Sequence, residues 1–185
     1  YSIENKKKCY FFIVDHNLRK NSSNEAHYVK KKLKLFKISS EILTIKKENI
    51  SKNIQSFARD NRYKLIIKKS LVKKIDVILT AHHADDLIEN FFIRLLRGSG
   101  LKGLISFSNI KSKVKHDDKI YILRPLIDIT KKDLAYISKN TFNFNVNDPS
   151  NNDEKFLRVK VRKLISNLEK DGLTFNKFKL SLNNL

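Results

Sequence analysis

Short apolar runs alternate with helix-spaced apolar stripes along much of the chain. Cys9–Asp15 (CYFFIVD) and Asp76–Thr80 (DVILT) are continuous apolar runs that end in polar clusters, a pattern typical of strands buried on both faces of a parallel sheet. Glu41–Lys46 alternates like a shorter strand. Ile120–Leu123, just before Arg124-Pro125, predicts a further strand.

Helical periodicity fills the segments between these strands. A capping box of Ser22 with Glu25 opens the first helix, and Thr130 with Asp133 opens a later one. The predicted helices are Ser22–Phe36, Asn53–Lys69, Asp85–Leu96, Thr130–Asn140 and Glu154–Lys170. Lys111–Lys119 is interpreted as a loop. This alternation predicts an α/β fold, a Rossmann-like parallel sheet with helices on both faces and ligands at the carboxyl ends of its strands.

The chain of 185 residues is long enough for one main α/β domain, and it shows no internal repeat. Gly172 stops the last predicted helix. We therefore expect a catalytic domain over residues 1–172. Residues 173–185 are expected to be a tail, the start of a linker or the start of a further domain.

The glycine-rich segment Gly98–Gly103 matches the G-x-G-x-x-G spacing of dinucleotide-binding loops. Such a loop must follow a strand and open a helix, so that pyrophosphate meets the helix N-terminus. This segment follows a predicted helix instead. We interpret Gly98 as the helix stop, and the other glycines as positions that allow close approach of the backbone to a neighbour or ligand.

The helix before these glycines has an apolar stripe and a charged face. The stripe consists of Leu87, Ile88, Phe91, Phe92, Leu95 and Leu96. Asp86, Glu89 and Arg97 are predicted to project from the opposite face. With His82 and His83 at the strand end, the two carboxylates would suit an ammonium group or a divalent cation. Two alternatives are that these acids only complement the helix dipole, and that the cluster is a zinc or HD-type hydrolase site whose other ligands are not evident.

Three further polar groupings are candidates for a site. Asp15–Arg19 (DHNLR) occupies the equivalent end of the first strand, where it would face a nucleotide or RNA phosphate, or serve as a polar turn. Arg59 and Arg62 share a helix face, which by itself indicates a solvated basic patch. Arg158 and Arg162 stand one turn apart on the last helix, where two phosphates or solvent-facing ion pairs explain them equally well.

The amino-acid composition predicts a polyanionic binding partner. The formal charge is +20, and basic side chains supply most sequence-independent affinity for nucleic acid, although 31 of the 39 basic residues are Lys and part of the excess reflects general composition. No apolar run is long enough to cross a membrane, and no signal peptide is evident, so a cytoplasmic location is expected. The lone Cys9 is interpreted as buried strand filler.

Six motifs, taken in order, resemble the bacterial tRNA(Ile)-lysidine synthetase family. They are VDHNLR (Val14–Arg19), ARDNRY (Ala58–Tyr63), TAHHADDLIEN (Thr80–Asn90), RLLRGSGLKGL (Arg94–Leu104), RPL (Arg124–Leu126) and DPSNND (Asp148–Asp153) with Arg158 and Arg162. The resemblance implies an N-type ATP pyrophosphatase of adenine nucleotide alpha hydrolase-like fold. Such enzymes use ATP to adenylate the wobble cytidine of the CAU anticodon in tRNA(Ile). Free lysine then displaces AMP, which changes codon reading from AUG to AUA and charging from methionine to isoleucine.

The resemblance also implies roles for individual residues. It places Asp86 and Glu89 on the substrate lysine, and His82 and His83 in the polar surround where the amine loses its proton. It places Arg62 at the ATP phosphates. The remaining residues that it implicates are Asp15 and His16 in ATP binding, and Arg19, Arg97, Arg158 and Arg162 in contact with tRNA or phosphate. Magnesium is the implied counter-ion, with unknown ligands.

Two departures from the family pattern keep alternatives open. The S-G-G-x-D-S pyrophosphate loop is not found, and residue 1 is Tyr, so we expect an amino-terminally truncated sequence that lacks the first strand and the PP-loop. Glu89-Asn90 replaces the usual Glu-Thr. One alternative is a tRNA thiolase of the same fold, which generally needs clustered cysteines. Another is a non-catalytic RNA-binding relic. The oligomeric state stays open, a homodimer being one option.

Overall fold

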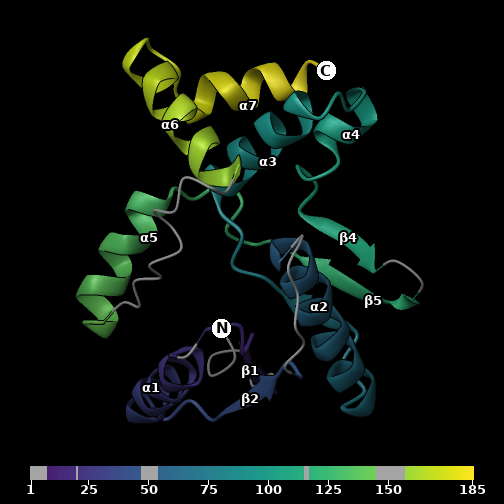
Figure 1. Cartoon of the computed structure of the whole chain (residues 1–185), viewed down its shortest axis with the longest axis vertical. Coiled ribbons are helices and arrows are strands. Elements are labelled where there is room, and N and C mark those ends of the chain that lie inside the picture. Colours follow the sequence, from purple (N-terminus) through teal and green to yellow (C-terminus); the bar gives the residue numbers. More distant parts are fainter. Residues whose placement is uncertain (1–7, 20, 47–53, 115–116, 145–156) are drawn as a thin grey trace. The chain divides into compact units, whose positions relative to one another are not determined.

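The computed structural model describes residues 8–19, 21–46, 54–114, 117–144 and 157–185. The chain divides into two compact units, Tyr1–Ile75 and Asp76–Leu185, and Figure 1 shows the helices and strands of each. Each unit has its own sheet with a parallel pair of strands, so the predicted α/β class is confirmed. Among the helices in the described ranges, none combines the length and the apolarity that a membrane span requires.

The first unit is a β-α-β-α arrangement. Its elements are β1 (Phe11–Asp15), α1 (Ser22–Leu35), β2 (Ser40–Thr44) and α2 (Ile54–Val72). The two strands pair in parallel, with Phe11 opposite Ser40 and Asp15 opposite Thr44. The carboxyl ends of both strands therefore meet at one edge, which is where ligands bind in sheets of this kind.

Two predictions in this unit are wrong in detail. Asn21, not Ser22, is the N-cap of α1, and Ser22 Oγ donates instead to the Arg19 carbonyl. Glu25 does not close a capping box, because its carboxylate pairs with the Arg19 guanidinium in the preceding turn. Cys9 is exposed and precedes β1, so it is not buried strand filler.

The second unit carries a three-stranded sheet and most of the helices. Its elements are β3 (Val77–Leu79), α3 (Ala84–Leu96), α4 (Leu101–Ile105), β4 (Lys111–Val114), β5 (Asp117–Leu123), α5 (Lys131–Ile137), a π-helix (Ser138–Phe142), α6 (Leu157–Lys170) and α7 (Phe175–Asn183). The strand order is β3-β5-β4, with β3 parallel and β4 antiparallel to β5. The range predicted as a loop, Lys111–Lys119, instead contains β4 and the start of β5, because pairing with β5 overrides a local sequence that lacks an apolar run.

The first half of the predicted α3 stripe lies in the core of the second unit: Leu87 and Ile88 are buried and Phe91 and Phe92 pack against them, whereas Leu95 and Leu96 are exposed. The buried cluster consists of Leu87 and Ile88 of α3, Val161 and Ile165 of α6, Phe178 and Leu182 of α7, and Phe107 and Ile127 from the segments after α4 and β5. Phe91 meets Phe178 of α7 edge to face, with ring centroids 5.2 Å apart. The segment after Gly172, which the sequence left as a tail or linker start, therefore contains a helix that packs on this core.

Candidate functional site

Asp15 lies at the carboxyl end of β1 and organises the turn that follows it. The residue is 4% exposed, its Oδ1 accepts the Asn17 N–H at 2.9 Å, and its Oδ2 accepts the Ser23 hydroxyl at 2.5 Å. Burial alone would raise the pKa of Asp15, but these hydrogen bonds outweigh it and lower the pKa below its usual value. Asp15 is therefore ionised, and its hydrogen bonds hold the turn that follows β1.

His16 and Arg62 meet beside Asp15 within the first unit. Arg62 Nη2 lies 2.7 Å from His16 Nε2, so the imidazole presents a lone pair to the guanidinium. Arg19 pairs at 3.0 Å with Glu25, and both side chains are about a third exposed. The structure thus brings Asp15, His16 and Arg62 together at the edge where β1 ends, while Arg19 is engaged by α1.

The end of β3 carries the first histidine of the T-A-H-H motif. His82 Nδ1 lies 2.9 Å from Thr80 Oγ1, and its ring meets Phe107 edge to face at 5.1 Å. Arg124, which follows β5, covers the Phe107 ring from 4.8 Å and donates to the Asn109 carbonyl at 3.0 Å. His82 is therefore fixed by neighbours on this strand edge.

His83 stands between two carboxylates at the start of α3. Its Nδ1 is 3.5 Å from Asp85 Oδ2, and its Nε2 is 3.5 Å from Asp86 Oδ2. The hydrogen bond that the His83 imidazole donates to the Asp85 carboxylate is the main reason that the pKa of His83 is raised, and the charge of Asp86 adds to it against the effect of burial. The same contact with His83 lowers the pKa of Asp85. Asp86 also accepts the His83 backbone N–H at 3.2 Å, which caps α3.

The helical pattern places Glu89 on the face of α3 opposite the apolar stripe, yet its side chain is buried. It is 3% exposed, because α6 packs against this face of α3 as well. Arg162 Nε approaches Glu89 Oε1 at 2.5 Å, and Arg158 Nε approaches Oε2 at 3.0 Å. The structure therefore joins three of the predicted site residues, Glu89, Arg158 and Arg162, into one ion-paired cluster.

A pocket of about 150 Å³ lies beside this cluster, between α3, α6 and the start of α5. It is lined by Asp85, Ile88, Glu89, Lys131, Arg162, Ile165, Ser166 and Glu169. Ile88, Glu89 and Ile165 are buried and form its base, whereas Lys131 and Glu169 are exposed at its rim. Asp85 Oδ2 accepts the Lys131 N–H at 2.7 Å and so fixes α5 against α3.

The glycine-rich segment turns the chain at the far end of α3. Gly98 has φ +71°, which confirms it as the helix stop, and Gly100 is the N-cap of the five-residue α4. Arg94 donates to the Gly103 carbonyl at 2.9 Å and to Asn90 Oδ1 at 2.8 Å, which ties α4 to α3. Arg97 is the exposed C-cap of α3, about 20 Å along the helix from His83, so it does not join the cluster at the other end.

Among the charged residues of the pocket, Lys131 and Glu169 were not singled out from the sequence and carried no motif. Asp85 entered only as part of the TAHHADDLIEN motif and was given no role of its own. Only Lys131 had a usable signal, because the Thr130 cap predicts free N–H groups in the first turn of α5. The predicted DPSNND turn, Asp148–Asp153, lies outside the described residues.

Parallel strands flanked by helices, with polar side chains gathered where the strands end, define a Rossmann-like α/β protein. The sequence pattern described as the PP-loop domain matches residues 1–169, and the chain belongs to that family.

Sequence relatives narrow the comparison. The chain is 41% identical over 156 residues to a tRNA(Ile)-lysidine synthase of Orientia tsutsugamushi, covering 84% of this chain and 34% of that one. It is 37% identical to the protein of that name from Zymomonas mobilis, and this alignment covers 82% of this chain and 46% of that one. It is 35% identical to the protein of that name from Rickettsia rickettsii, and this alignment covers 88% of this chain and 33% of that one. The chain therefore spans between a third and a half of the length of these curated relatives.

A solved structure supports the fold. The U34-tRNA thiolase NcsA from Methanococcus maripaludis, with its [4Fe-4S] cluster, superposes with a TM-score of 0.70 over 94% of this chain and 61% of that one. The sequence identity of 17% limits this likeness to the fold. It agrees with the predicted adenine nucleotide alpha hydrolase-like architecture.

Proposed function

We propose that the full-length protein joins free lysine to the wobble cytidine of the CAU anticodon of tRNA(Ile) at the expense of ATP. The observation that carries this proposal is the charged pocket at the start of α3, built from the HHADDLIE motif and α6. The names of the sequence relatives support the same substrate. In the reaction the C2 oxygen of the cytidine is first adenylated, and the lysine amine then takes the place of AMP.

The pocket suits a free amino acid better than a nucleotide. Drug- and cofactor-sized ligands occupy about 300 to 1,000 Å³, whereas this pocket measures about 150 Å³. Its acidic groups match the ammonium groups of lysine. Glu89, which lines the pocket, and Asp86, which caps α3 and does not line it, are the proposed lysine-binding residues. Glu89 would be shared between lysine and the two arginines that already contact it.

His83 is the better placed of the two histidines to take the proton that the attacking amine must lose. Its imidazole lies between Asp85, which lines the pocket, and Asp86. His82 is held by Thr80 and Phe107 and supports the polar surround. A histidine whose pKa is raised by neighbouring carboxylates is a stronger proton acceptor than an isolated one.

The first unit offers residues for ATP. Arg62 and His16 lie together at the carboxyl edge of the parallel β1–β2 pair, and a guanidinium there fits a phosphate oxygen. Asp15 holds the turn that carries His16. Arg62 would bind and orient the phosphates and stabilise the charge that develops on the leaving pyrophosphate.

We assign no magnesium ligand. Within the part of the chain that the structure describes, no three His, Cys, Asp or Glu side chains converge in a way that would hold a metal ion. Magnesium is proposed as the counter-ion of the ATP phosphates, and its ligands are left open.

Basic side chains supply the proposed contacts with RNA. The formal charge of +20 favours a polyanion, and Arg158 and Arg162 are each about a third exposed beside the pocket. Arg97 and Arg19 are exposed and suit phosphate contacts elsewhere on the RNA. The RNA partner of the full-length protein is therefore part of the proposal.

Mass spectrometry of tRNA tests the proposal directly. The full-length protein, incubated with tRNA(Ile) bearing CAU, should give a mass increase of one lysine less water that requires both ATP and lysine. Asp86→Asn should reduce lysine incorporation about ten-fold or more while pyrophosphate release by the adenylation step changes little. Equal loss of both steps would refute a lysine-specific role for Asp86.

The outcome of the same assay separates the alternatives. A tRNA that gains sulfur would identify a thiolase, and a tRNA that is bound but never adenylated would identify a non-catalytic relic. Either result would overturn the proposed ligase.

A further inference from the structure

A short helical arm, residues 131–144, begins beside the pocket. It consists of α5, the π-helix and the two residues that follow. None of the residues of these two helices is buried. Tyr136 is 71% exposed, the largest exposed fraction among the described aromatic side chains, and Ile137 beside it is 48% exposed. The arm therefore presents an aromatic ring with an apolar neighbour to solvent.

The arm is held in shape by its own contacts. Asn140 Nδ2 donates to the Tyr136 carbonyl at 2.8 Å, and Ser138 Oγ donates to the Phe144 carbonyl at 3.0 Å. The rings of Phe142 and Phe144 meet edge to face, with centroids 6.4 Å apart. These contacts fix the backbone that carries Tyr136, so a ligand that meets the ring does not first have to order the chain.

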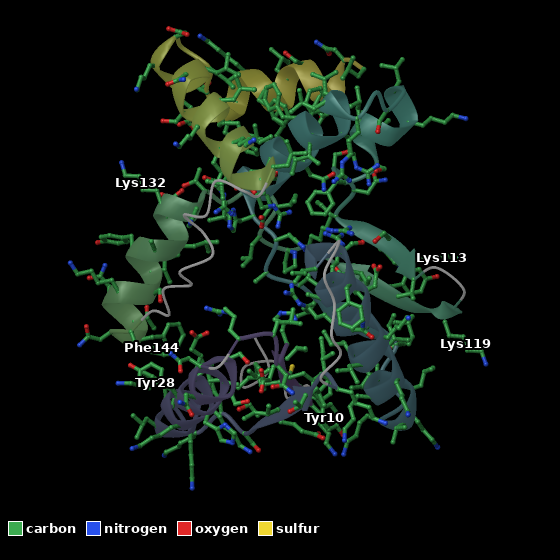
Figure 2. The ribbon with its side chains drawn as sticks, in the orientation of Figure 1. Tyr10, Tyr28, Lys113, Lys119, Lys132 and Phe144 are labelled. Carbon is green, nitrogen blue, oxygen red and sulfur yellow. The ribbon has the colours of Figure 1, made fainter. Side chains whose placement is uncertain are left out.

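Lysines flank Tyr136 on this arm. Lys132 is four positions before it and Lys139 is three positions after it, the spacing of neighbours on one helix face. Both lysines are exposed, and no ion pair joins either of them to another described residue. Figure 2 shows the Lys132 side chain directed away from the α5 ribbon. The carboxylate of Asp133 accepts the Thr130 hydroxyl at the start of α5, so the lysines give the surround of Tyr136 a positive charge.

We propose that Tyr136 stacks on a base of the single-stranded RNA segment that carries the modified nucleotide, with Lys132 and Lys139 on neighbouring phosphates. The inference rests on the proposed function and adds a surface that positions the RNA, which we call the stacking platform. Surfaces for single-stranded RNA combine aromatic rings with basic side chains, because each base has a flat face and each nucleotide a charge. Protein interfaces are instead depleted of lysine. The charges therefore favour RNA over a second protein.

The position of the arm fits a contact close to the reacting nucleotide. Asp85, which lines the pocket, accepts the Lys131 N–H at 2.7 Å, so the start of α5 is fixed against α3. Tyr136 follows Lys131 by five residues, which is about 7.5 Å along a helix that rises about 1.5 Å per residue. Stacked nucleotides of one strand advance by about 3.4 Å each. A base about two positions from the reacting one is therefore within reach of Tyr136.

Binding of tRNA to the full-length protein tests the stacking platform. Tyr136→Ala should raise the Kd for tRNA(Ile) bearing CAU about ten-fold, because a stack between a base and an aromatic ring is lost. Tyr136→Phe keeps the ring and should stay within about two-fold of wild type. Tyr28→Ala, which removes a 45% exposed tyrosine from α1, is the matched control. Fluorescence anisotropy without ATP or lysine gives the Kd values, so the result does not depend on catalysis.

Abasic nucleotides in the anticodon loop identify the stacked base. When the base that meets Tyr136 is removed, wild type and Tyr136→Ala should bind the tRNA equally. An abasic nucleotide elsewhere in the loop should preserve the difference between the two proteins. If no single abasic position abolishes that difference, Tyr136 does not stack on a base of the loop, and the platform is wrong.

The salt dependence of binding separates the lysines from the ring. Lys132→Gln and Lys139→Gln should each lower the slope of log K against log salt by about 0.7, the value for one phosphate of a single strand. Tyr136→Ala should leave that slope unchanged, since it removes no charge. Lys102→Gln, exposed on α4 at the other end of α3, is the control and should change neither the slope nor the Kd. Unchanged slopes for Lys132→Gln and Lys139→Gln would remove both lysines from the RNA contact.

The outcomes distinguish the stacking platform from the proposed function. If Tyr136→Ala binds tRNA like wild type, or if Tyr136→Phe or Tyr28→Ala loses as much affinity, the platform is wrong although lysine is still incorporated. A change in the oligomeric state of Tyr136→Ala, measured by light scattering, would assign this face to a second copy of the chain and also overturn it. If the binding pattern holds while wild type adds no lysine to the tRNA, the proposed function fails and the platform stands.

Discussion

The charged groups at the end of β1 and those between α3 and α6 differ in how they are held. Asp15 is bonded to groups two and eight positions further along the chain, and its neighbour Arg62 is exposed. Glu89 is buried and joins an arginine 73 positions away on another helix. The first cluster shapes a turn that a ligand can reach. The second holds two helices together as well as lining a pocket, so its residues should affect stability more.

Removing the Glu89 carboxylate should have the largest effect. Glu89→Ala leaves Arg158 and Arg162 without the carboxylate that they share, and breaking fully buried pairs costs about 3 to 5 kcal/mol. Because both arginines are about a third exposed, we expect about 2 kcal/mol, measured by urea unfolding. Glu169→Ala, on the exposed side of α6, is the control and should cost less than about 0.5 kcal/mol. If Glu89→Ala and Glu169→Ala lowered the free energy of unfolding equally, the cluster around Glu89 would have no special structural role.

The pH dependence of stability should show the next largest effect. The pKa of His83 is raised in the folded state, so protonated His83 stabilises the fold below its ordinary pKa of 6.5, and this contribution is lost as pH rises through the folded-state value. Urea midpoints should therefore fall across that range in wild type. In Asp85→Asn the fall should be smaller, because the main cause of the shift is gone. A variant whose profile matches wild type would contradict this assignment.

Arg62→Ala should have the smallest effect on stability. Arg62 is exposed, and its contact with His16 lies at the edge of the sheet, where such pairs contribute within about 1 kcal/mol. Urea unfolding should therefore give a midpoint close to wild type, so that any loss of adenylation reflects ligand binding. A destabilisation as large as that of Glu89→Ala would show that both clusters are structural.

These contrasts explain which parts of the fold the sequence revealed. The apolar runs before Asp15 and Thr80 predict strands, and Gly98 predicts the end of α3, because each signal lies within a few residues of the structure it determines. β4 was missed because Lys-Ser-Lys-Val carries little intrinsic preference and depends on pairing with β5.

The candidate site was predictable only in its local parts. The HHADDLIE motif identified His83, Asp86 and Glu89 from one helix and the turn before it. It did not predict that α6 covers Glu89, since a helical pattern shows which residues share a face but not which neighbour packs on that face. Lys131 and Glu169 belong to the pocket solely through tertiary packing.

The short strand β4 lies at one side of its sheet, with β5 as its neighbour among the described strands. Unpaired backbone groups on such a strand can recruit a strand from another molecule. Lys111 and Lys113 stand on β4, and Figure 2 shows Lys113 and Lys119 at this hairpin. Bringing a second copy alongside would place like charges next to one another. We therefore expect these lysines to disfavour strand-to-strand association of two copies, and replacing them with Thr or Val should increase aggregation in concentrated solution.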